Sequence, residues 1–353
     1  MLLNRTVSAN TNVPQLPSVI FGTSGLGNLY EAIPFETKLE IIKQSVLHSH
    51  GTPMFDTAGK YGAGLALEVL GKCLKALAVP KEGVIISNKL GWYQTELKTA
   101  EPTFEKGIWR EMKNDAVQKI SYKGILECFE QGNELLGAYD SQMASIHDPD
   151  EYLAAATDSN DDAKRYNDIL EAYEALKELK QQGKINSIGV GAKNWRSIER
   201  ISKDISLDWI MIANSLSVKS HPKELLDFVK QLHDKGTVII NSAVFNGGFL
   251  VGRDYYNYVL VDAATAEGKA LHNWRNDFFA LCKSFNVQPA EACFNFGFNI
   301  AGISSVAVST TQPEKVKSNI EMATKQMPDG FWDAMVAKGL LENKNFFKKN
   351  ENS

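Results

Sequence analysis

The sequence predicts an α/β fold, a (β/α)8 barrel of the TIM type with long insertions in the loops that follow its strands. Three observations lead to this prediction. Short apolar runs typical of buried strands alternate with longer stretches whose apolar residues recur at helical spacing. Eight such runs occur, nearly all followed by a helical stretch, which favours a closed parallel barrel over an open sheet. No long polar linker divides the chain, so we expect a single domain over 1–353 with a core at about 18–322.

Each element follows from a local pattern. The stretch 35–50, for example, has Leu39, Ile42, Val46 and Leu47 on one side of a helix. The predicted strands are 18–22, 53–56, 84–91, 142–148, 186–191, 208–214, 237–243 and 304–309. The predicted helices are 35–50, 64–77, 123–137, 161–182, 195–203, 222–235, 267–285, 288–299, 312–321 and a last one around 328–341.

Two long segments, 92–121 and 244–266, show no clean period. Loops of this length in a compact domain tend to be lids or binding loops. The aromatic residues of the first segment are Trp92, Tyr93, Phe104 and Trp109. We expect this segment to contribute to the substrate pocket, with Trp92 as the candidate that stacks on a substrate.

Composition excludes several classes of protein. Hydrophobic residues make up 44% of the chain and charged residues 23%, with a formal net charge of −4, as in a globular protein with a large core. No basic block suggests nucleic-acid binding. No apolar run approaches about 18 residues, and the first residues lack a long apolar core, so we expect a cytoplasmic protein without a membrane segment.

The cysteines carry no metal or disulfide signature. The four are Cys73, Cys128, Cys282 and Cys293. None belongs to a CxxC pair or lies near a histidine at metal-ligand spacing. We expect small buried hydrophobes in a reducing compartment and no metal site.

Polar residues at strand ends are the candidates for chemistry, because the active site of such a barrel lies at the carboxyl ends of its strands. The residues at or near these ends are Asp56, Lys89, His147, Asn214 and Ser242. A buried Lys89 ammonium would need a carboxylate partner, which Asp56 on a neighbouring strand could supply. A purely structural ion pair stays an alternative. His147 is the one of six histidines that directly follows a buried-looking strand.

Tyr61 lies in the loop after the second strand, in the stretch GKYGAG. An unperturbed tyrosine has a pKa of about 10, so it needs a nearby cation to exchange a proton near pH 7. Lys89 would be that cation and Asp56 would hold it. The alternative is an exposed aromatic residue that anchors the loop.

The order of Asp56, Tyr61, Lys89 and His147 over an eight-unit barrel pattern resembles the aldo-keto reductases. Four local stretches carry the resemblance, which covers roughly 18–322. They are FDTAGKYGAGLALEVLG, ISNKLG, EALKELKQQGKINSIGVG and STTQPEKVKSNIEM. The stretches YKGILECFEQGNELLG, IHDPDEY and VFNGGFL are similar to the sugar-oxidising branch, which includes D-threo-aldose 1-dehydrogenases, L-fucose dehydrogenases and L-galactose dehydrogenases.

The resemblance implies an NAD(P)-dependent oxidoreductase that oxidises an aldose of the L-fucose, L-galactose or D-arabinose type at C1 to the lactone. Tyr61 would take the hydroxyl proton, Lys89 and Asp56 would tune Tyr61, and His147 would orient the substrate oxygen. Alternatives in the family are a carbonyl or aldehyde reductase and a non-catalytic NADP-sensing protein similar to potassium-channel β subunits. A barrel aldolase with Lys89 as its Schiff base is a further alternative. We expect a small-molecule sugar as partner, and nothing in the sequence indicates an oligomeric state.

The cofactor would bind without a Rossmann fingerprint, which is absent. The resemblance places Gly22, Thr23 and Asn214 at the nicotinamide end, and Ser242, Val244 and Asn246 along the pyrophosphate. It places at the adenosine end Ser309, Thr310, Thr311, Lys315 and Asn319. The chain departs from the family at Lys193 and Asn194, where many members have a Ser-Asn pair, and at Val308, where a basic residue is frequent. Lys315 remains as partner for a 2′-phosphate, and NADP is favoured over NAD.

Overall fold

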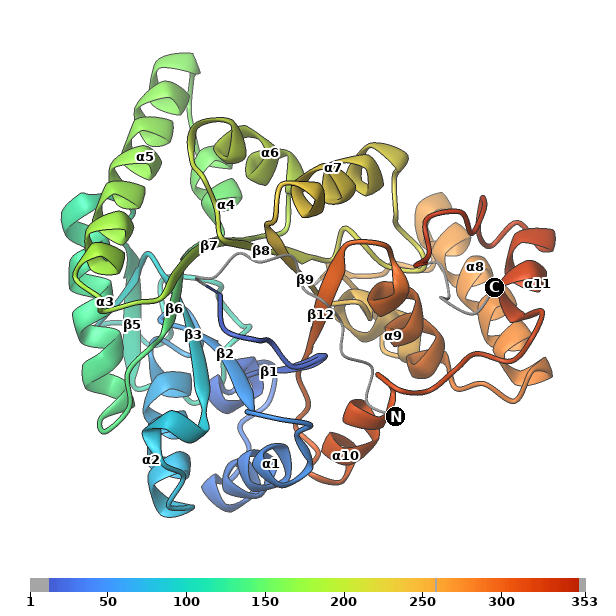
Figure 1. The fold of residues 1–353 in the computed structure, drawn as a ribbon, viewed down its shortest axis with the longest axis horizontal. Helices are drawn as coiled ribbons and strands as arrows, with labels where there is room; N and C mark the ends of the chain where they lie inside the picture. Colours follow the sequence, from blue (N-terminus) through green and yellow to red (C-terminus); the bar gives the residue numbers. More distant parts are fainter. Residues whose placement is uncertain (1–12, 258, 349–353) are drawn as a thin grey trace.

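Eight parallel strands close into a barrel in a computed structural model that describes residues 13–257 and 259–348 (Figure 1). Around the barrel the strands run in the order β1-β12-β9-β8-β7-β6-β3-β2. Their bounds are β1 Val19–Gly22, β2 Met54–Ala58, β3 Ile85–Leu90, β6 Met143–His147, β7 Ser187–Ala192, β8 Trp209–Ala213, β9 Val238–Ser242 and β12 Ile303–Val308. The predicted fold class is confirmed, and each predicted strand overlaps an observed one.

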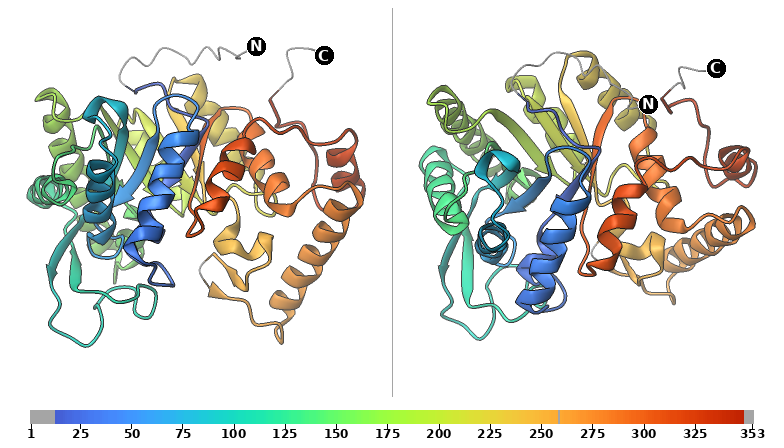
Figure 2. Two further views of the ribbon diagram at one scale, coloured as in Figure 1. Left: turned by 90° about the horizontal axis from the view of Figure 1, so that it is seen from below. Right: turned by 60° about the horizontal axis from the view of Figure 1, so that its bottom comes forward.

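The predicted helices also form, and most of them surround the barrel, whereas α8 and α11 lie outside α9, away from the strands (Figures 1 and 2). They are α1 Phe35–His48, α2 Leu65–Ala76, α3 Tyr122–Leu136, α5 Ser159–Gln181, α6 Trp195–Asp204, α7 Lys223–Asp234, α8 Ala266–Ser284, α9 Pro289–Asn299, α10 Glu314–Glu321 and α11 Phe331–Ala337. The sequence did not predict the short helices η1 Ser24–Gly27, η2 Lys81–Gly83, α4 Pro149–Ala154 and η3 Asn246–Val251.

The apolar runs form strands that are buried on both faces. All residues of β2 and β3 are buried, as expected for parallel strands covered by helices outside and by the barrel interior inside. Met54, Met143 and Trp209 belong to the apolar cluster inside the barrel. Gly189 makes room for the Trp209 ring, since a Cβ at this position would lie 2.3 Å from it.

The two long insertions each contain a small antiparallel pair of strands. In the first, β4 Trp92–Glu96 pairs with β5 Asn114–Gln118. In the second, β10 Tyr255–Tyr256 pairs with β11 Val259–Leu260. Both insertions follow barrel strands and project from the same end of the barrel (Figure 2). The sequence predicted these segments only as loops, because strands this short or this polar leave no clear alternation.

The first insertion is tied to the loop that follows β1. The Tyr30 amide donates a hydrogen bond to the Ile108 carbonyl at 2.9 Å, and the Arg110 amide donates to the Asn28 carbonyl at 3.0 Å. Lys38 of α1 supports this loop from below, since its buried ammonium donates to the Leu26 carbonyl at 2.9 Å. The insertion is therefore fixed over one side of the barrel end.

Residues 1–12, 258 and 349–353 lie outside the described part of the chain, so the expectation of one domain over 1–353 stays a prediction. Over the described residues, no helix combines the length and the apolar character that crossing a membrane requires.

Candidate active site

The strand order brings three of the predicted catalytic residues together. Strands β2, β3 and β6 are neighbours in the barrel. Met54 of β2 and Met143 of β6 point into the barrel interior, and side chains two residues apart on a strand share a face. Asp56 and His147 therefore continue the inward-facing rows towards the carboxyl ends, and Lys89 of β3 lies between these two strands.

Lys89 and Asp56 form a buried ion pair. The Lys89 Nζ pairs with Asp56 Oδ2, and their side chains are 3% and 4% exposed. The ammonium also lies 3.4 Å from the Thr57 carbonyl oxygen. Burial raises the pKa of the Asp56 carboxyl above its ordinary value, and the Lys89 charge opposes that rise. Gly191 of β7 leaves room for the lysine, since a Cβ there would lie 2.9 Å from Lys89 Cδ.

Tyr61 lies over this pair. The Lys89 Nζ is 4.8 Å from the centre of the Tyr61 ring. The His147 ring meets the Tyr61 ring edge to face, with centres 5.4 Å apart and planes at 87°. Gly27 permits the loop to approach, because a Cβ there would lie 2.7 Å from the Tyr61 carbonyl carbon. The four residues predicted from the sequence thus form one contact group, whose catalytic role stays a prediction.

His147 is buried and electrically neutral at pH 7. Burial lowers its pKa well below the ordinary value, and the nearby Lys89, Lys60 and Lys193 charges lower it further, against the attraction of Asp148. In the described part of the chain, the ring Nδ1 is buried without a hydrogen-bond partner. The Nε2 lies 3.7 Å from Asp148 Oδ2.

A group of charged side chains next to His147 was not predicted from the sequence. We call Lys60, Glu105, Asp148, Glu151 and Lys193 the mouth cluster. The Lys60 ammonium lies 2.8 Å from Glu105, 3.0 Å from Asp148 and 2.7 Å from Glu151. Lys193 pairs with Glu151 and lies 3.5 Å from Asp148. The cluster connects the β2–α2 loop, the first insertion, α4 and the end of β7.

The charges of the mouth cluster stabilise one another. Burial opposes the charge on Lys60, yet Asp148, Glu105 and Glu151 raise its pKa above the ordinary range. Lys193 behaves in the same way, with Asp148 as its strongest partner. The one sequence signal for this cluster is the pair of polar stretches GKYG and HDPDEY, each at a strand end.

Aromatic rings of the first insertion close the site on another side. Trp109 lies 6.0 Å from the Tyr61 ring, centre to centre, and donates its indole N–H to Glu105 at 2.8 Å. Trp92, the candidate predicted from the sequence, packs on Phe104 with ring centres 5.3 Å apart. The Lys60 ammonium lies 5.2 Å from the Trp92 ring. The ring in contact with Tyr61 is therefore that of Trp109. The sequence indicated Trp92 and not Trp109.

The predicted cofactor residues near β1 and β12 lie side by side. The Ser24 and Ser309 hydroxyls are 3.4 Å apart, and a Cβ at Gly25 would lie 3.2 Å from Thr311 Cγ2. Thr23 donates its hydroxyl to the Asp56 carbonyl at 3.1 Å, which joins this loop to the second strand.

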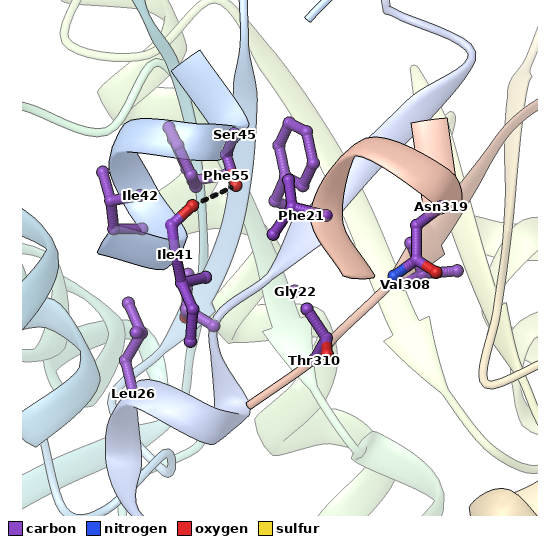
Figure 3. Close-up of a pocket in the computed structure, with 12 residues that line it drawn as sticks. Phe21, Gly22, Leu26, Ile41, Ile42, Ser45, Phe55, Val308, Thr310 and Asn319 are labelled. Atoms are coloured by element: carbon purple, nitrogen blue, oxygen red, sulfur yellow. Dashed lines mark hydrogen bonds between the residues drawn. The ribbon is translucent and has the colours of Figure 1, made fainter. Parts of the chain in front are cut away.

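A small cavity lies behind this loop, between α1 and α10 (Figure 3). Gly22, Thr310 and Asn319 form part of its lining. Its volume of about 20 Å³ is room for roughly one water molecule. The cavity therefore reaches the predicted adenosine residues but cannot itself hold a cofactor ring.

The predicted residues near β8 and β9 form a second group. Asn246 donates its side-chain N–H to the Asn214 carbonyl at 2.9 Å, and the Ser242 hydroxyl donates to the Ile212 carbonyl at 3.2 Å. Within the described residues, the side-chain oxygens of Asn214 and Asn246 are buried without partners. The orphaned acceptor of Asn214 suits a ligand that brings an N–H donor, such as the carboxamide of nicotinamide. Asn246, predicted along the pyrophosphate, is fully buried and holds the Asn214 backbone instead. Val244 is buried against Gly297 and can offer a ligand only its backbone.

Of the residues at the two departures from the family pattern, Lys193 and Asn194 have partners within the chain and Val308 is buried. Lys193 belongs to the mouth cluster, and the Asn194 side chain caps α6 by accepting the Arg196 amide at 3.0 Å. Lys315, in the first turn of α10, is exposed and makes no ion pair among the described residues.

Known proteins are similar in sequence to this chain over most of its length. A pyridoxal 4-dehydrogenase from Microbacterium luteolum is 25% identical over 334 residues, which cover 91% of this chain and 93% of the relative. A D-threo-aldose 1-dehydrogenase from Pseudomonas sp is 22% identical, covering 92% and 95%. An L-galactose dehydrogenase from Arabidopsis thaliana is 22% identical, covering 88% and 85%.

Two solved structures share the fold. An aldo-keto reductase from Bacillus halodurans, in its holo form, superposes with a TM-score of 0.62 at 18% identity, covering 91% of both chains. The glycerol dehydrogenase of Gluconobacter oxydans superposes with a TM-score of 0.65 at 15% identity, covering 96% of this chain and 98% of its own. Residues 18–339 match the Aldo/keto reductase family as a whole. The chain therefore belongs to the aldo/keto reductase family and is an oxidoreductase.

Proposed function

We propose that this oxidoreductase is an NAD(P)-dependent sugar dehydrogenase that oxidises an aldose at C1 to the lactone. The observation that carries the proposal is the packing of the Lys89 ammonium between the Asp56 carboxylate and the Tyr61 ring, with His147 at the ring edge. This arrangement supports a phenol that exchanges a proton near neutral pH, because the nearby cation stabilises the phenolate.

Each of the four residues has a distinct part in the proposed reaction. The Tyr61 phenolate accepts the proton of the C1 hydroxyl as the C1–H bond breaks. Lys89 stabilises the phenolate, and Asp56 holds Lys89 in place. The neutral His147 donates a hydrogen bond to the reacting oxygen and orients it. A bound nicotinamide would supply the acceptor for the hydride of C1, so that the two electrons and the proton are both accounted for.

The family's cofactor is NAD(P)H, and we propose that this chain uses NADP. The unpartnered side-chain acceptor of Asn214 supports binding of the carboxamide end. The exposed Lys315 at the start of α10 supports binding of the 2′-phosphate, since a lysine is a point charge that suits a phosphate. NAD is the alternative.

The proposed substrate is a neutral sugar. The names of two relatives, D-threo-aldose 1-dehydrogenase and L-galactose dehydrogenase, support this class. The mouth cluster supports it as well, because its three carboxylates outnumber its two ammonium groups beside His147 and would repel an anionic substrate. Trp109, beside Tyr61, supports an apolar contact with a sugar ring.

A second candidate is a reductase of small aldehydes. An NADH-specific methylglyoxal reductase from Escherichia coli is 24% identical over 335 residues, which supports the reverse direction with the same four residues. The aldolase alternative is disfavoured, because Lys89 is engaged by a buried carboxylate whereas a Schiff base needs a neutral amine. The family match argues against the non-catalytic sensor, and the cytoplasmic location stays a prediction.

A panel of substrates tests the proposal. L-fucose, L-galactose, D-arabinose and L-glucose are each incubated with NADP and with NAD, and the nicotinamide absorbance is followed. Methylglyoxal with NADPH or NADH tests the reverse direction. We expect turnover of at least one aldose with lactone as product. Turnover of methylglyoxal alone would replace the dehydrogenase by the reductase, and cofactor binding without turnover of either class would favour the sensor.

A further inference from the structure

Asp148 follows His147 directly in the chain, and its carboxylate turns back towards the histidine ring. Its backbone adopts the left-handed conformation, with φ of 48°, at the residue before α4. In this position an aspartate usually accepts amide N–H bonds from the first helical turn. The Asp148 side chain makes no such bond. Its Oδ2 instead lies 3.7 Å from His147 Nε2.

The carboxylate stays ionised although it is buried. Its side chain is 7% exposed, and burial alone would raise its pKa. The Lys60 and Lys193 charges nevertheless hold the pKa of Asp148 below its ordinary value. Lys60 is the closest cation, at 3.0 Å and hydrogen-bonded, and it is itself only 3% exposed. Lys60 is the residue next to Tyr61, so this contact joins the two loops that carry Tyr61 and His147.

We propose that Asp148 is a positioning residue that holds the neutral His147 ring with its single proton on Nε2, and that Lys60 keeps the Asp148 carboxylate in place. A carboxylate favours an N–H that faces it and repels a nitrogen lone pair. The other nitrogen, Nδ1, has no hydrogen-bond partner among the described residues that would favour a proton there. The Asp148 carboxylate near Nε2 is therefore the contact that decides the tautomer.

The proposed function needs this tautomer, because the Nε2–H would donate to the reacting oxygen. The inference rests on the proposed function only for this catalytic role and not for the tautomer itself. The separation of 3.7 Å between Nε2 and Oδ2 is longer than a hydrogen bond. The N–H is therefore oriented by Asp148 without being saturated, so that a substrate oxygen can accept it. Removing the carboxylate would leave the ring in place and change which nitrogen carries the proton.

Other charged groups also surround the ring and bear on its titration. The groups that act on the ring directly are Asp148 before α4, Lys60 of the β2–α2 loop, Lys89 of β3 and Lys193 after β7. Asp56, Glu105 and Glu151 pair with these lysines and act on the ring only through them. Of these, Asp148 raises the pKa of His147, whereas Lys89, Lys60 and Lys193 lower it.

The tautomer can be measured without substrate or cofactor. Protein labelled with ¹⁵N-histidine is examined by long-range ¹H–¹⁵N spectra, in which a protonated and an unprotonated ring nitrogen have distinct shifts. A His147→Gln sample assigns the signal. We expect Nε2–H in the native protein. In Asp148→Asn we expect a shift towards Nδ1–H, because the amide can offer an N–H to Nε2.

The variants are chosen to fold. Asparagine tolerates the left-handed backbone of position 148 as well as aspartate does. Glu151→Gln is the matched control, because it removes a carboxylate that pairs with Lys60 and Lys193 but has no contact with the histidine ring. This control should keep Nε2–H. Circular dichroism and urea midpoints show that each variant is folded before its spectrum is interpreted.

The pKa of His147, measured by the same ¹⁵N shifts, gives a second readout. Two variants should change this pKa in opposite directions. Asp148→Asn removes an attraction for the proton and should lower the pKa of His147 further. Lys60→Met removes a repulsion and should raise it. A role of Asp148 confined to packing would leave the pKa of His147 unchanged in Asp148→Asn.

The inference is overturned if the native protein has Nδ1–H, if Asp148→Asn keeps Nε2–H, or if both variants shift the titration the same way. Each of these outcomes is independent of turnover. A confirmed tautomer in a protein that oxidises no aldose would leave the inference standing and refute the proposed function instead.

Discussion

The Lys89 ammonium lies 4.8 Å from the centre of the Tyr61 ring while it pairs with the carboxylate of Asp56 beneath. One cation thus serves a buried carboxylate and a phenol at the same time. The pair is buried on strands β2 and β3, whereas Tyr61 belongs to the loop above them. The stability of the pair and the chemistry of the phenol can therefore be separated by experiment.

Replacing Lys89 by methionine should destabilise the fold as well as abolish turnover. Removing one partner of a buried ion pair costs about 3–5 kcal/mol, because the other charge is left unpaired. Burial already raises the pKa of Asp56, so the orphaned carboxyl can take up a proton, and the loss should be greater at pH 8 than at pH 5. Urea unfolding at both values measures it. The double variant Asp56→Asn/Lys89→Met should lose less than the sum of the single variants, and simple additivity would argue against the pair.

Gly191→Ala should impair turnover more than stability. The new Cβ would lie 2.9 Å from Lys89 Cδ, so the lysine stem has to move away from Tyr61. A displacement of about 1 Å at a catalytic group can lower kcat by about 100-fold. Ser187→Ala on the same strand removes a buried hydroxyl that has no partner within the described residues, and it should leave kcat nearly unchanged. Equal kcat values for the two variants would contradict the role of Gly191.

The stability of the protein should fall as pH drops below about 6.5, the ordinary pKa of histidine. Burial lowers the pKa of His147, so between its folded and unfolded values the unfolded chain binds more protons. The slope from this one residue reaches about 1.4 kcal/mol per pH unit. Thermal or urea unfolding from pH 7.5 to 5 should show a smaller slope in His147→Gln than in the native protein. The exposed His50, changed to Gln, serves as control and should keep the native slope.

Lys315→Met should weaken NADP binding by about tenfold and leave NAD binding nearly unchanged. A hydrogen bond to a charged group contributes about 1.5–3 kcal/mol to binding when it is buried, and less when it is exposed as Lys315 is. Fluorescence titration with each cofactor measures both affinities. Lys317→Met on the same helix, where the lysine pairs with Glu321 at 3.8 Å, is the matched control. An equal loss for NADP and NAD would contradict recognition of the 2′-phosphate by Lys315.

The barrel was predictable from the sequence because its signals are local and repeated. Each buried strand is a short apolar run, and each helix has its own apolar side, as 35–50 shows. Because neighbouring parallel strands end at the same side of a barrel, Asp56, Lys89 and His147 could also be brought together without a structure.

The remainder of the site was not predictable, since it depends on how insertions fold back. No spacing in the sequence connects Lys60 with Glu105 of the first insertion, or with Asp148, 88 positions further along the chain. Trp109 reaches Tyr61 only because the insertion is bonded to the loop after β1. Val244 was expected along the pyrophosphate together with Ser242 and Asn246, yet its side chain is buried against α9. Contacts of this kind are set by tertiary packing, which leaves no periodic signal.

The most direct test of the account is oxidation of an aldose by Tyr61→Phe, with the affinity for the nicotinamide cofactor measured on the same sample. Phenylalanine keeps the ring that packs against Lys89, His147 and Trp109 and removes only the hydroxyl. We predict that kcat falls by at least about 100-fold, the usual scale of general acid–base catalysis, while cofactor affinity stays within about twofold of the native value. Unchanged kcat in Tyr61→Phe would contradict the account, since the proton would then have to leave by a route that does not involve Tyr61.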